Sequence, residues 1–340
     1  FSCIAPFNFP FMVPLWFLPY AVACGNTFIT KPSEQCPLSQ EAFYELLDDV
    51  DFPPGVVNLV NGDKEVVDIL LEHPDIEGIS FVGSTPVGKY LYSKGSANGK
   101  RVQAQAGAKN CLVVMPDADI DKTIMNILTS AFGTAGQRCL ANSLLVVVGD
   151  VYEPLVKRLV DAAARLKIGD GMDESVQMGP VASLKSYKNI LNYIDIGVDG
   201  GAKLMLDGRK IKVDEFPNGY FIGPTIFSDV EPKMKIAQDE IFGPVLGIIH
   251  VANFDEAVDM IHSSPYGNAS SIFTSSGKWA REFKYRVKAG NIGINIGVAA
   301  PIASFPFSGM KNSFFGDLHG QGRDAILFFT ERKVAITRWF

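Results

Sequence analysis

The segment ISFVGSTPVG, residues 79–88, has the pattern of a strand that leads directly into a helix. The residues Gly83-Ser84-Thr85-Pro86 follow the expected strand, with a hydroxyl for a helix N-cap and Pro86 suited to the first helical position. The free N–H groups and the dipole of such a helix start attract an anion at the carboxyl end of a strand. The segment therefore predicts either a phosphate-binding turn or an ordinary capped helix.

The alternation of strand and helix extends to both sides of this segment. Expected strands lie at residues 26–30, 56–59, 79–82 and 102–105, and expected helices lie at residues 38–47, 65–72 and 87–94. Short apolar or β-branched runs that alternate with amphipathic stretches are typical of a parallel sheet covered by helices. The predicted fold class is therefore α/β.

The pattern restarts after Lys109, which indicates a second domain and a boundary near Gly107. The expected elements there are strands at 112–114 and 144–148, helices at 120–131 and 152–166, loops around one helix at 169–223, and helix and strand at 254–296. Glycine, phenylalanine and proline crowd the chain after Pro301, and two strand candidates follow at residues 326–329 and 333–337. We expect a terminal arm there.

The charge balance excludes nucleic acid as the expected partner. The 340 residues include 31 Lys plus Arg and 37 Asp plus Glu, so the net charge is −6, and no basic block occurs. The cysteines are Cys3, Cys24, Cys36, Cys111 and Cys139. Their wide spacing without a CxxC pair, together with only four histidines, predicts a reducing compartment and no zinc site.

Residues 1–24 carry no charge and are mostly apolar, so a membrane span or a signal peptide has to be considered. Prolines at positions 6, 10, 14 and 19 argue against a spanning helix, because each costs about 3 kcal/mol in a helix interior. A basic leader is also lacking. Because the chain begins with Phe1 inside what reads as a buried segment, we expect a fragment.

Two further segments bear groups that can do chemistry. Lys31 and Glu34 directly follow an expected strand, where they either hold ribose hydroxyls or lie in a solvated loop. The segment FGTAGQRC, residues 132–139, places Arg138 beside Cys139, and a guanidinium next to a thiol stabilises the thiolate. Cys139 is the candidate nucleophile, and the alternative is a buried small hydrophobe.

These segments, in this order, resemble the aldehyde dehydrogenase superfamily when taken together with APFNFP at residues 5–10 and EIFGPV at residues 240–245. Four segments resemble its CoA-acylating methylmalonate (malonate) semialdehyde dehydrogenases: GQRC at 136–139, GAKN at 107–110, FSG at 307–309 and SFFGDLHG at 313–320. The resemblance covers essentially the whole chain. It implies a Rossmann-type cofactor domain, incomplete at its N-terminus, followed by an α/β catalytic domain.

In that reading, residues 1–107 are the later part of the NAD-binding domain, residues 108–309 are the catalytic domain, and residues 310–340 are a C-terminal arm for oligomerisation. The resemblance implies that Cys139 attacks the aldehyde as a thiolate. The side-chain amide of Asn8 and the backbone N–H of Cys139 would then meet the oxyanion. Arg138 would bind the substrate carboxylate as a planar fork.

The resemblance also implies the residues that hold NAD. Lys31 and Glu34 would hold the adenosine ribose, and Gly83 and Ser84 would hold the pyrophosphate. The remaining cofactor-binding positions are Glu240, on the nicotinamide ribose, Phe242, at the same end of the cofactor, and Phe7.

Two positions depart from the wider superfamily. Gln105 stands where hydrolytic members have a glutamate base, and glutamine cannot take a proton from water at neutral pH. This departure favours release of the acyl group by CoA. Cys111 stands where the CoA-acylating relatives commonly have histidine.

The leading hypothesis is thus an NAD-dependent enzyme that converts methylmalonate or malonate semialdehyde to propionyl-CoA or acetyl-CoA with loss of carbon dioxide. It implies a homo-oligomer, a tetramer in the resembled family, located in the bacterial or archaeal cytoplasm or the mitochondrial matrix. A hydrolytic enzyme for another small aldehyde acid is the first alternative. A truncated, non-catalytic chain that binds nucleotide or a partner is the second, because the family's upstream segment has no counterpart before Phe1. For the same reason we expect poor solubility of the 340 residues alone.

Overall fold

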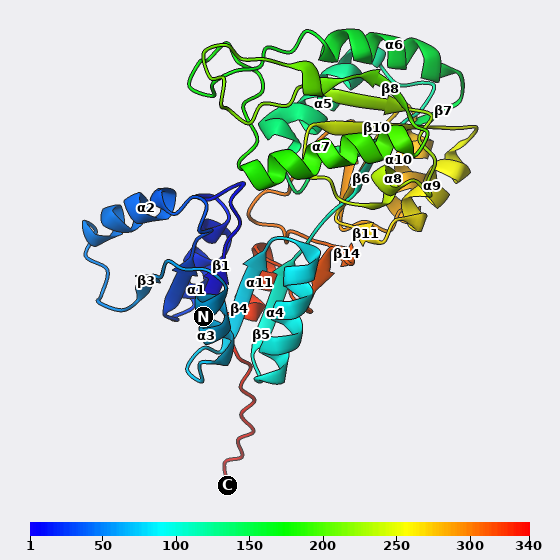
Figure 1. Ribbon diagram of the computed structural model, residues 1–340. Helices are drawn as coiled ribbons and strands as arrows, with labels where there is room; N and C mark the ends of the chain where they lie inside the picture. The colour runs from blue at the N-terminus through cyan, green and yellow to red at the C-terminus, as the bar shows by residue number, and fades with distance from the viewer. The chain divides into compact units, whose positions relative to one another are not determined.

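The computed structural model describes residues 1–340, which divide into two compact units (Figure 1). Unit 1 comprises residues 1–106, 301–308 and 314–340, and unit 2 comprises residues 107–300 and 309–313. The main chain passes from the first unit to the second between Ala106 and Gly107. None of the helices is long and apolar enough to cross a membrane.

Unit 1 is built on a six-stranded sheet with the order β15-β5-β4-β1-β2-β3. Its strands are β1 (Ser2–Ile4), β2 (Phe28–Lys31), β3 (Val57–Leu59), β4 (Gly78–Val82), β5 (Arg101–Gln105) and β15 (Phe314–Phe315). Only β15 runs antiparallel to its neighbour. Its helices are α1 (Leu18–Ala23), α2 (Leu38–Asp48), α3 (Lys64–Glu72), α4 (Thr85–Ala97) and α11 (Gly322–Phe328). A parallel sheet with helical connections is the architecture that the alternating pattern predicts.

The core of unit 1 lies between this sheet and helices α3 and α4. Ile79 and Leu91 are fully buried there, and Gly95 in α4 lets the helix approach Val102 in β5 closely. A Cβ at Gly95 would lie 2.8 Å from a methyl group of Val102. The close approach packs the C-terminal part of α4 against β5.

Unit 2 contains a seven-stranded sheet with the order β13-β12-β6-β7-β10-β9-β8. Its strands are β6 (Asn110–Val114), β7 (Asn142–Val148), β8 (Lys203–Leu206), β9 (Thr225–Ser228), β10 (Val245–Val251), β12 (Ala269–Phe273) and β13 (Asn291–Ile294). Its helices are α5 (Ile120–Phe132), α6 (Tyr152–Ala163), α7 (Leu184–Asp199), α8 (Lys235–Gln238), α9 (Phe254–Ser263) and α10 (Gly277–Arg286). A separate pair joins β11 (Tyr266–Gly267) to β14 (Met310–Lys311).

The central strands of unit 2 are buried on both faces, as expected of a parallel sheet covered by helices. Residues 144–147 of β7 have no exposed surface, and β6 and β10 on either side are nearly as buried. Only β8 pairs antiparallel, at the edge of the sheet. The α/β fold class is therefore confirmed in both units.

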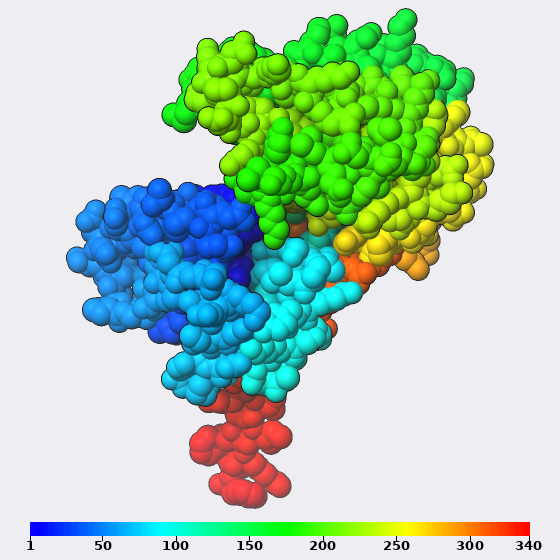
Figure 2. Space-filling view, viewed as in Figure 1, coloured from blue at the N-terminus to red at the C-terminus, as the bar shows by residue number.

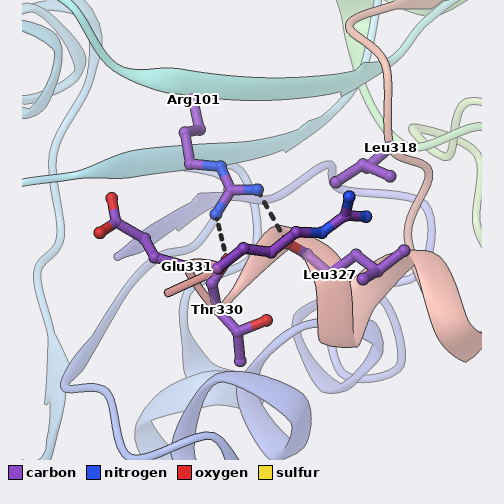
Figure 3. Close-up of a pocket in the computed structure, with 6 residues that line it drawn as sticks. Arg101, Leu318, Leu327, Thr330 and Glu331 are labelled. Carbon is purple, nitrogen blue, oxygen red and sulfur yellow. Dashed lines mark hydrogen bonds between the residues drawn. The ribbon is translucent and has the colours of Figure 1, made fainter. Parts of the chain in front are cut away.

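The strands expected at residues 326–329 and 333–337 are wrong. Residues 322–328 form helix α11, and the residues after it have no regular secondary structure. The guanidinium of Arg101 stabilises the end of this helix, since it donates to the carbonyls of Leu327 at 2.7 Å and Thr330 at 2.9 Å (Figure 3). A cation at the C-terminus of a helix satisfies carbonyls that have no partner within the helix.

The same arginine borders a hollow of about 470 Å³ in unit 1 that also involves Leu318, Glu331 and Arg332 (Figure 3). None of the predicted reaction residues lines it. Beyond the hollow, the last residues extend away from the rest of unit 1 as an exposed tail, in which Trp339 is 91% exposed (Figure 2).

Candidate active site

The segment between α5 and β7 forms a tight turn that presents Cys139. Thr134, Ala135 and Gly136 have φ angles of 54°, 51° and 69°, in the left-handed region that side chains disfavour. Gly136 also packs against the backbone of the chain near Gly243, where a Cβ would lie 2.2 Å from the Gly243 carbonyl oxygen. The glycine is therefore required, and it brings the nucleophile segment against the segment that contains Glu240.

The two segments line a narrow pocket of about 20 Å³, room for about one water molecule. Four of the predicted site residues line it: Arg138, Cys139, Glu240 and Phe242. All four belong to unit 2, so the tertiary structure of this unit alone brings them together.

The electrostatic environment of Cys139 is mixed. Burial raises the pKa of the thiol to about 12, and the negative charge of Glu240 acts in the same direction. The backbone N–H groups of Cys139 and Leu140 lower the pKa, and Arg138 lowers it least. The surroundings as a whole therefore disfavour the thiolate, contrary to the expectation from Arg138. Among the groups that oppose the rise, the backbone N–H groups act more strongly than the guanidinium.

Arg138 is held by the end of helix α5. Its Nη2 donates to the backbone carbonyls of Thr129 and Ser130, the second at 3.3 Å. Its Nε is buried and has no hydrogen-bond partner. The guanidinium is therefore fixed through Nη2, and its Nε–H has no partner.

Glu240 is half-buried beside Ala108, whose backbone N–H donates to Oε1 at 2.8 Å. Burial raises the pKa of this carboxyl to about 7, and the Ala108 N–H and the charge of Lys109 oppose the rise. Phe242, two residues on, has a φ of 56°, which a non-glycine residue adopts only where packing demands it.

The cofactor residues predicted in the first part of the chain lie at the carboxyl ends of strands in unit 1. Lys31 ends β2, and its Nζ lies 3.2 Å from the carboxylate of Glu34. Gly83 follows β4, and a Cβ there would lie 2.5 Å from the Phe81 ring. Ser84 is the N-cap of α4, but its hydroxyl makes no capping hydrogen bond.

Phe7 and Asn8 follow β1, which ends at Ile4 between β2 and β4. The carbonyl of Phe7 accepts a hydrogen bond from the Cys36 thiol at 3.4 Å. The predicted site residues of unit 1 therefore gather at one edge of its sheet, where ligands bind in parallel α/β folds.

Gln105 ends β5 and is buried in unit 1. In the amide orientation that satisfies both groups, Nε2 donates to the carbonyl of Phe81 and Oε1 accepts from the N–H of Gly320, each at 2.9 Å. The side chain therefore joins β4 to the chain near Gly320, a role that sequence reasoning did not identify.

Two residues that contact Cys139 were also missed, and so was Lys109, whose charge acts on Glu240. Asn110 and Asn268 each donate from Nδ2 to the backbone carbonyl of Cys139 at 2.8 Å. Lys109 is 3% exposed with a buried Nζ that has no hydrogen-bond partner, and burial lowers its pKa to about 8. Lys109 and Asn110 lie in the GAKN segment that had already been singled out, whereas nothing in the sequence near Asn268 pointed to Cys139.

Known proteins resemble this chain over nearly its whole length. Malonate-semialdehyde dehydrogenase 1 of Oceanobacillus iheyensis is 52% identical over 337 residues, which cover 99% of this chain and 69% of the relative. The crystal structure of methylmalonate-semialdehyde dehydrogenase from Oceanimonas doudoroffii superposes with a TM-score of 0.98 at 46% identity, covering 99% of this chain and 70% of that one.

An aldehyde dehydrogenase from Bacillus cereus in complex with NAD+ superposes with a TM-score of 0.92 at 34% identity, covering 97% of this chain and 66% of that one. The sequence profile of the aldehyde dehydrogenase family matches residues 1–335. These matches confirm the resemblance and the fold inferred from the sequence. The protein is an enzyme that belongs to the aldehyde dehydrogenase family.

Proposed function

We propose that this aldehyde dehydrogenase oxidises malonate or methylmalonate semialdehyde with NAD and transfers the acyl group to CoA, with release of carbon dioxide. The observation that carries the proposal is the pocket in unit 2, where Cys139, Arg138 and Glu240 line one cavity. The names of the Oceanobacillus and Oceanimonas relatives support the substrate class.

The residues of unit 1 fit a dinucleotide. The carboxylate of Glu34, paired with the buried Lys31, suits the two hydroxyls of an adenosine ribose. The hydroxyl of Ser84 is not used for capping, so it and the first amides of α4 suit a pyrophosphate, with Gly83 allowing close approach. We also assign Phe7, Glu240 and Phe242 to cofactor binding. When bound, NAD supplies the hydride acceptor.

The first step is attack of Cys139, as thiolate, on the aldehyde carbon. A carbon–sulfur bond forms, and the electron pair of the carbonyl π bond moves to oxygen. We assign the backbone N–H of Cys139 and the side-chain amide of Asn8 to this oxyanion. Departure of a hydride from the same carbon then leaves a thioester on Cys139.

Arg138 is assigned to the carboxylate at the other end of the substrate. The guanidinium is fixed by Thr129 and Ser130, and its unpartnered Nε offers an N–H to an anion. That carboxylate is one carbon away from the thioester carbonyl. When its carbon–carbon bond breaks, carbon dioxide leaves, the electron pair is delocalised onto the carbonyl oxygen, and the resulting carbanion takes up a proton.

We assign release of the acyl group to CoA. Its thiol attacks the thioester carbonyl as thiolate, and Cys139 leaves as thiolate in an exchange that is close to balanced in energy. Water would need a base, and both ends of the Gln105 amide are already hydrogen bonded to Phe81 and Gly320. This arrangement supports thiolysis rather than hydrolysis.

The test is NADH formation from malonate semialdehyde with and without CoA. We expect steady turnover and acetyl-CoA with CoA, and at most one NADH per site without it. A matched assay with an aldehyde that lacks the carboxylate isolates the role of Arg138, since Arg138→Lys should impair only the reaction of the acid substrate. Equal turnover without CoA, with free acid as the product, would contradict the proposal.

A hydrolytic aldehyde dehydrogenase is the second candidate, and one observation favours it. Glu240 lines the same pocket as Cys139, and its pKa of about 7 suits proton transfer near neutral pH. The CoA test decides between the two, because a Glu240-assisted attack of water would make turnover independent of CoA.

A further inference from the structure

We infer that Asn110 and Asn268 are positioning residues that hold the peptide between Cys139 and Leu140 so that its N–H stays directed at the nucleophilic sulfur. This inference rests on the proposed function of Cys139 and deepens it. The carbonyl of that peptide accepts two amide hydrogen bonds, one from each asparagine, both at 2.8 Å. Since a carbonyl oxygen has two lone pairs, both are filled by these side chains.

The two asparagines come from different parts of unit 2 that the sheet brings together. Asn110 begins β6 and Asn268 immediately precedes β12, and these strands are neighbours in the sheet. Both side chains are buried, with 2% and 3% exposure. Their convergence on one carbonyl is therefore a property of the sheet and not of any local turn.

Each asparagine is itself fixed by further hydrogen bonds. Asn110 accepts from the Ala269 N–H at 3.0 Å and also donates to the Ala141 carbonyl at 2.9 Å. The backbone carbonyl of Asn268 accepts from the backbone and the side chain of Asn291 in β13. The two donors are consequently held in place before any substrate binds, which is the condition for a preorganised site.

The opposite end of the same peptide faces the thiol. The N–H of Leu140, at that end, lowers the pKa of the Cys139 thiol, as does the N–H of Cys139. A carbonyl that accepts hydrogen bonds polarises its peptide and strengthens the N–H at the other end, by about 10–30% per bond in condensed-phase estimates. The asparagines therefore act on the thiolate through the peptide, without contacting the substrate.

If Asn268 had a purely structural role, it would only satisfy the buried carbonyl of Cys139. The experiment separates this role from the positioning of the peptide N–H. The variant is Asn268→Leu, which keeps the branched shape of the side chain and removes the donor, and Asn268→Ala serves if leucine does not pack. The readout is the pH dependence of iodoacetamide alkylation of Cys139, with Cys139→Ala to subtract the other four cysteines. We expect the midpoint of alkylation to rise by roughly 0.5–1 pH unit, and kcat to fall about tenfold with the KM for NAD unchanged.

The matched control is Asn26→Ala in unit 1. The Asn26 amide donates to two backbone carbonyls, those of Ala21 and Phe329, and lies far along the chain from the reaction residues of unit 2. This variant should lower the melting temperature and leave the alkylation midpoint unchanged. If Asn268→Leu behaves in the same way as the control, the positioning role is wrong.

A different experiment tests the proposed function. Retained turnover in Cys139→Ala would remove this thiol from the mechanism, whereas the alkylation profile would still report on the peptide that the asparagines hold.

Discussion

The carboxylate of Glu240 accepts a hydrogen bond of 2.8 Å from the backbone N–H of Ala108, so one residue of the pocket is fixed to the first residues of unit 2. Ala108 precedes Lys109 and Asn110, of which the second holds the carbonyl of Cys139. A short segment therefore contacts both the carboxyl and the nucleophile of the pocket. Any displacement of residues 108–110 is expected to disturb both groups together.

Glu240 makes the stability of the protein depend on pH. Its pKa is raised from 4.5 to about 7 in the folded state, so the folded protein binds the proton more tightly than the unfolded chain. The stabilisation of the folded state by the protonated carboxyl is complete below pH 4.5 and is lost as the pH rises through 7. We expect Glu240→Gln to be the more stable protein at pH 8 by about 1–3 kcal/mol, and to lose that advantage at pH 4. Urea unfolding at both values checks this, and equal pH profiles for the two proteins would contradict it.

Cys139→Ala should abolish NADH formation and leave NAD binding measurable, because the hydride cannot leave until sulfur has added to the aldehyde. Isothermal titration with NAD and a single-turnover assay test the two statements separately. Mutation of the buried Cys3, which lies in β1, to Ala is the matched control and should retain turnover. NADH formation by the Cys139 variant would exclude this residue as the nucleophile.

Glu34 should make the protein prefer NAD over NADP. Its carboxylate, next to Lys31, would repel a 2′-phosphate on the adenosine ribose. Replacing Glu34 by Ser should narrow the preference, measured as the ratio of kcat/KM for the two cofactors, by about tenfold or more. The thermal stability should change little, because an ion pair with one exposed partner contributes at most about 1 kcal/mol. An unchanged cofactor ratio would remove Glu34 from the ribose site.

Gln105→Glu should destabilise the protein and should not create a hydrolytic enzyme. The glutamate would place an oxygen against the Phe81 carbonyl, where the amide now donates, and leave that buried acceptor without a donor. The expected cost is about 1–3 kcal/mol in the free energy of unfolding, measured with urea. The comparison variant is Gln103→Glu, because Gln103 is the other buried glutamine of β5. A Gln105→Glu protein of normal stability with CoA-independent turnover would show that the side chain serves the site instead.

Gly136→Ala should destabilise the nucleophile turn. The φ of 69° alone costs roughly 1–2 kcal/mol for a side chain, and the new Cβ would lie 2.2 Å from the Gly243 carbonyl. The variant is expected to lose activity together with thermal stability. Gly171→Ala is the control, because its Cβ would meet no atom within 4 Å. Full activity of Gly136→Ala would show that the turn can relax without moving Cys139.

The sequence predicted much of the fold because most elements carry their own pattern. The strand expected at residues 79–82 is β4 (Gly78–Val82), and the helix expected at 120–131 is α5 (Ile120–Phe132). Strand β1 was missed because it is only three residues long, in a proline-rich segment without periodicity. Helix α11 was mistaken for a strand because a short apolar run has no period, and the guanidinium of Arg101 that satisfies its last carbonyls comes from 226 residues away.

The sequence by itself determined the α/β class, the family and the residue types of the site, because hydrophobic spacing, glycine positions and a thiol beside a guanidinium are local chemistry. Only the tertiary structure decided how those groups are supported. Asn268 reaches the Cys139 carbonyl across 129 residues, and Gln105 is occupied by Phe81 and Gly320. A hydrogen bond depends on two atoms lying about 3 Å apart in a fixed direction, and residues distant in sequence acquire that geometry only when the sheets assemble.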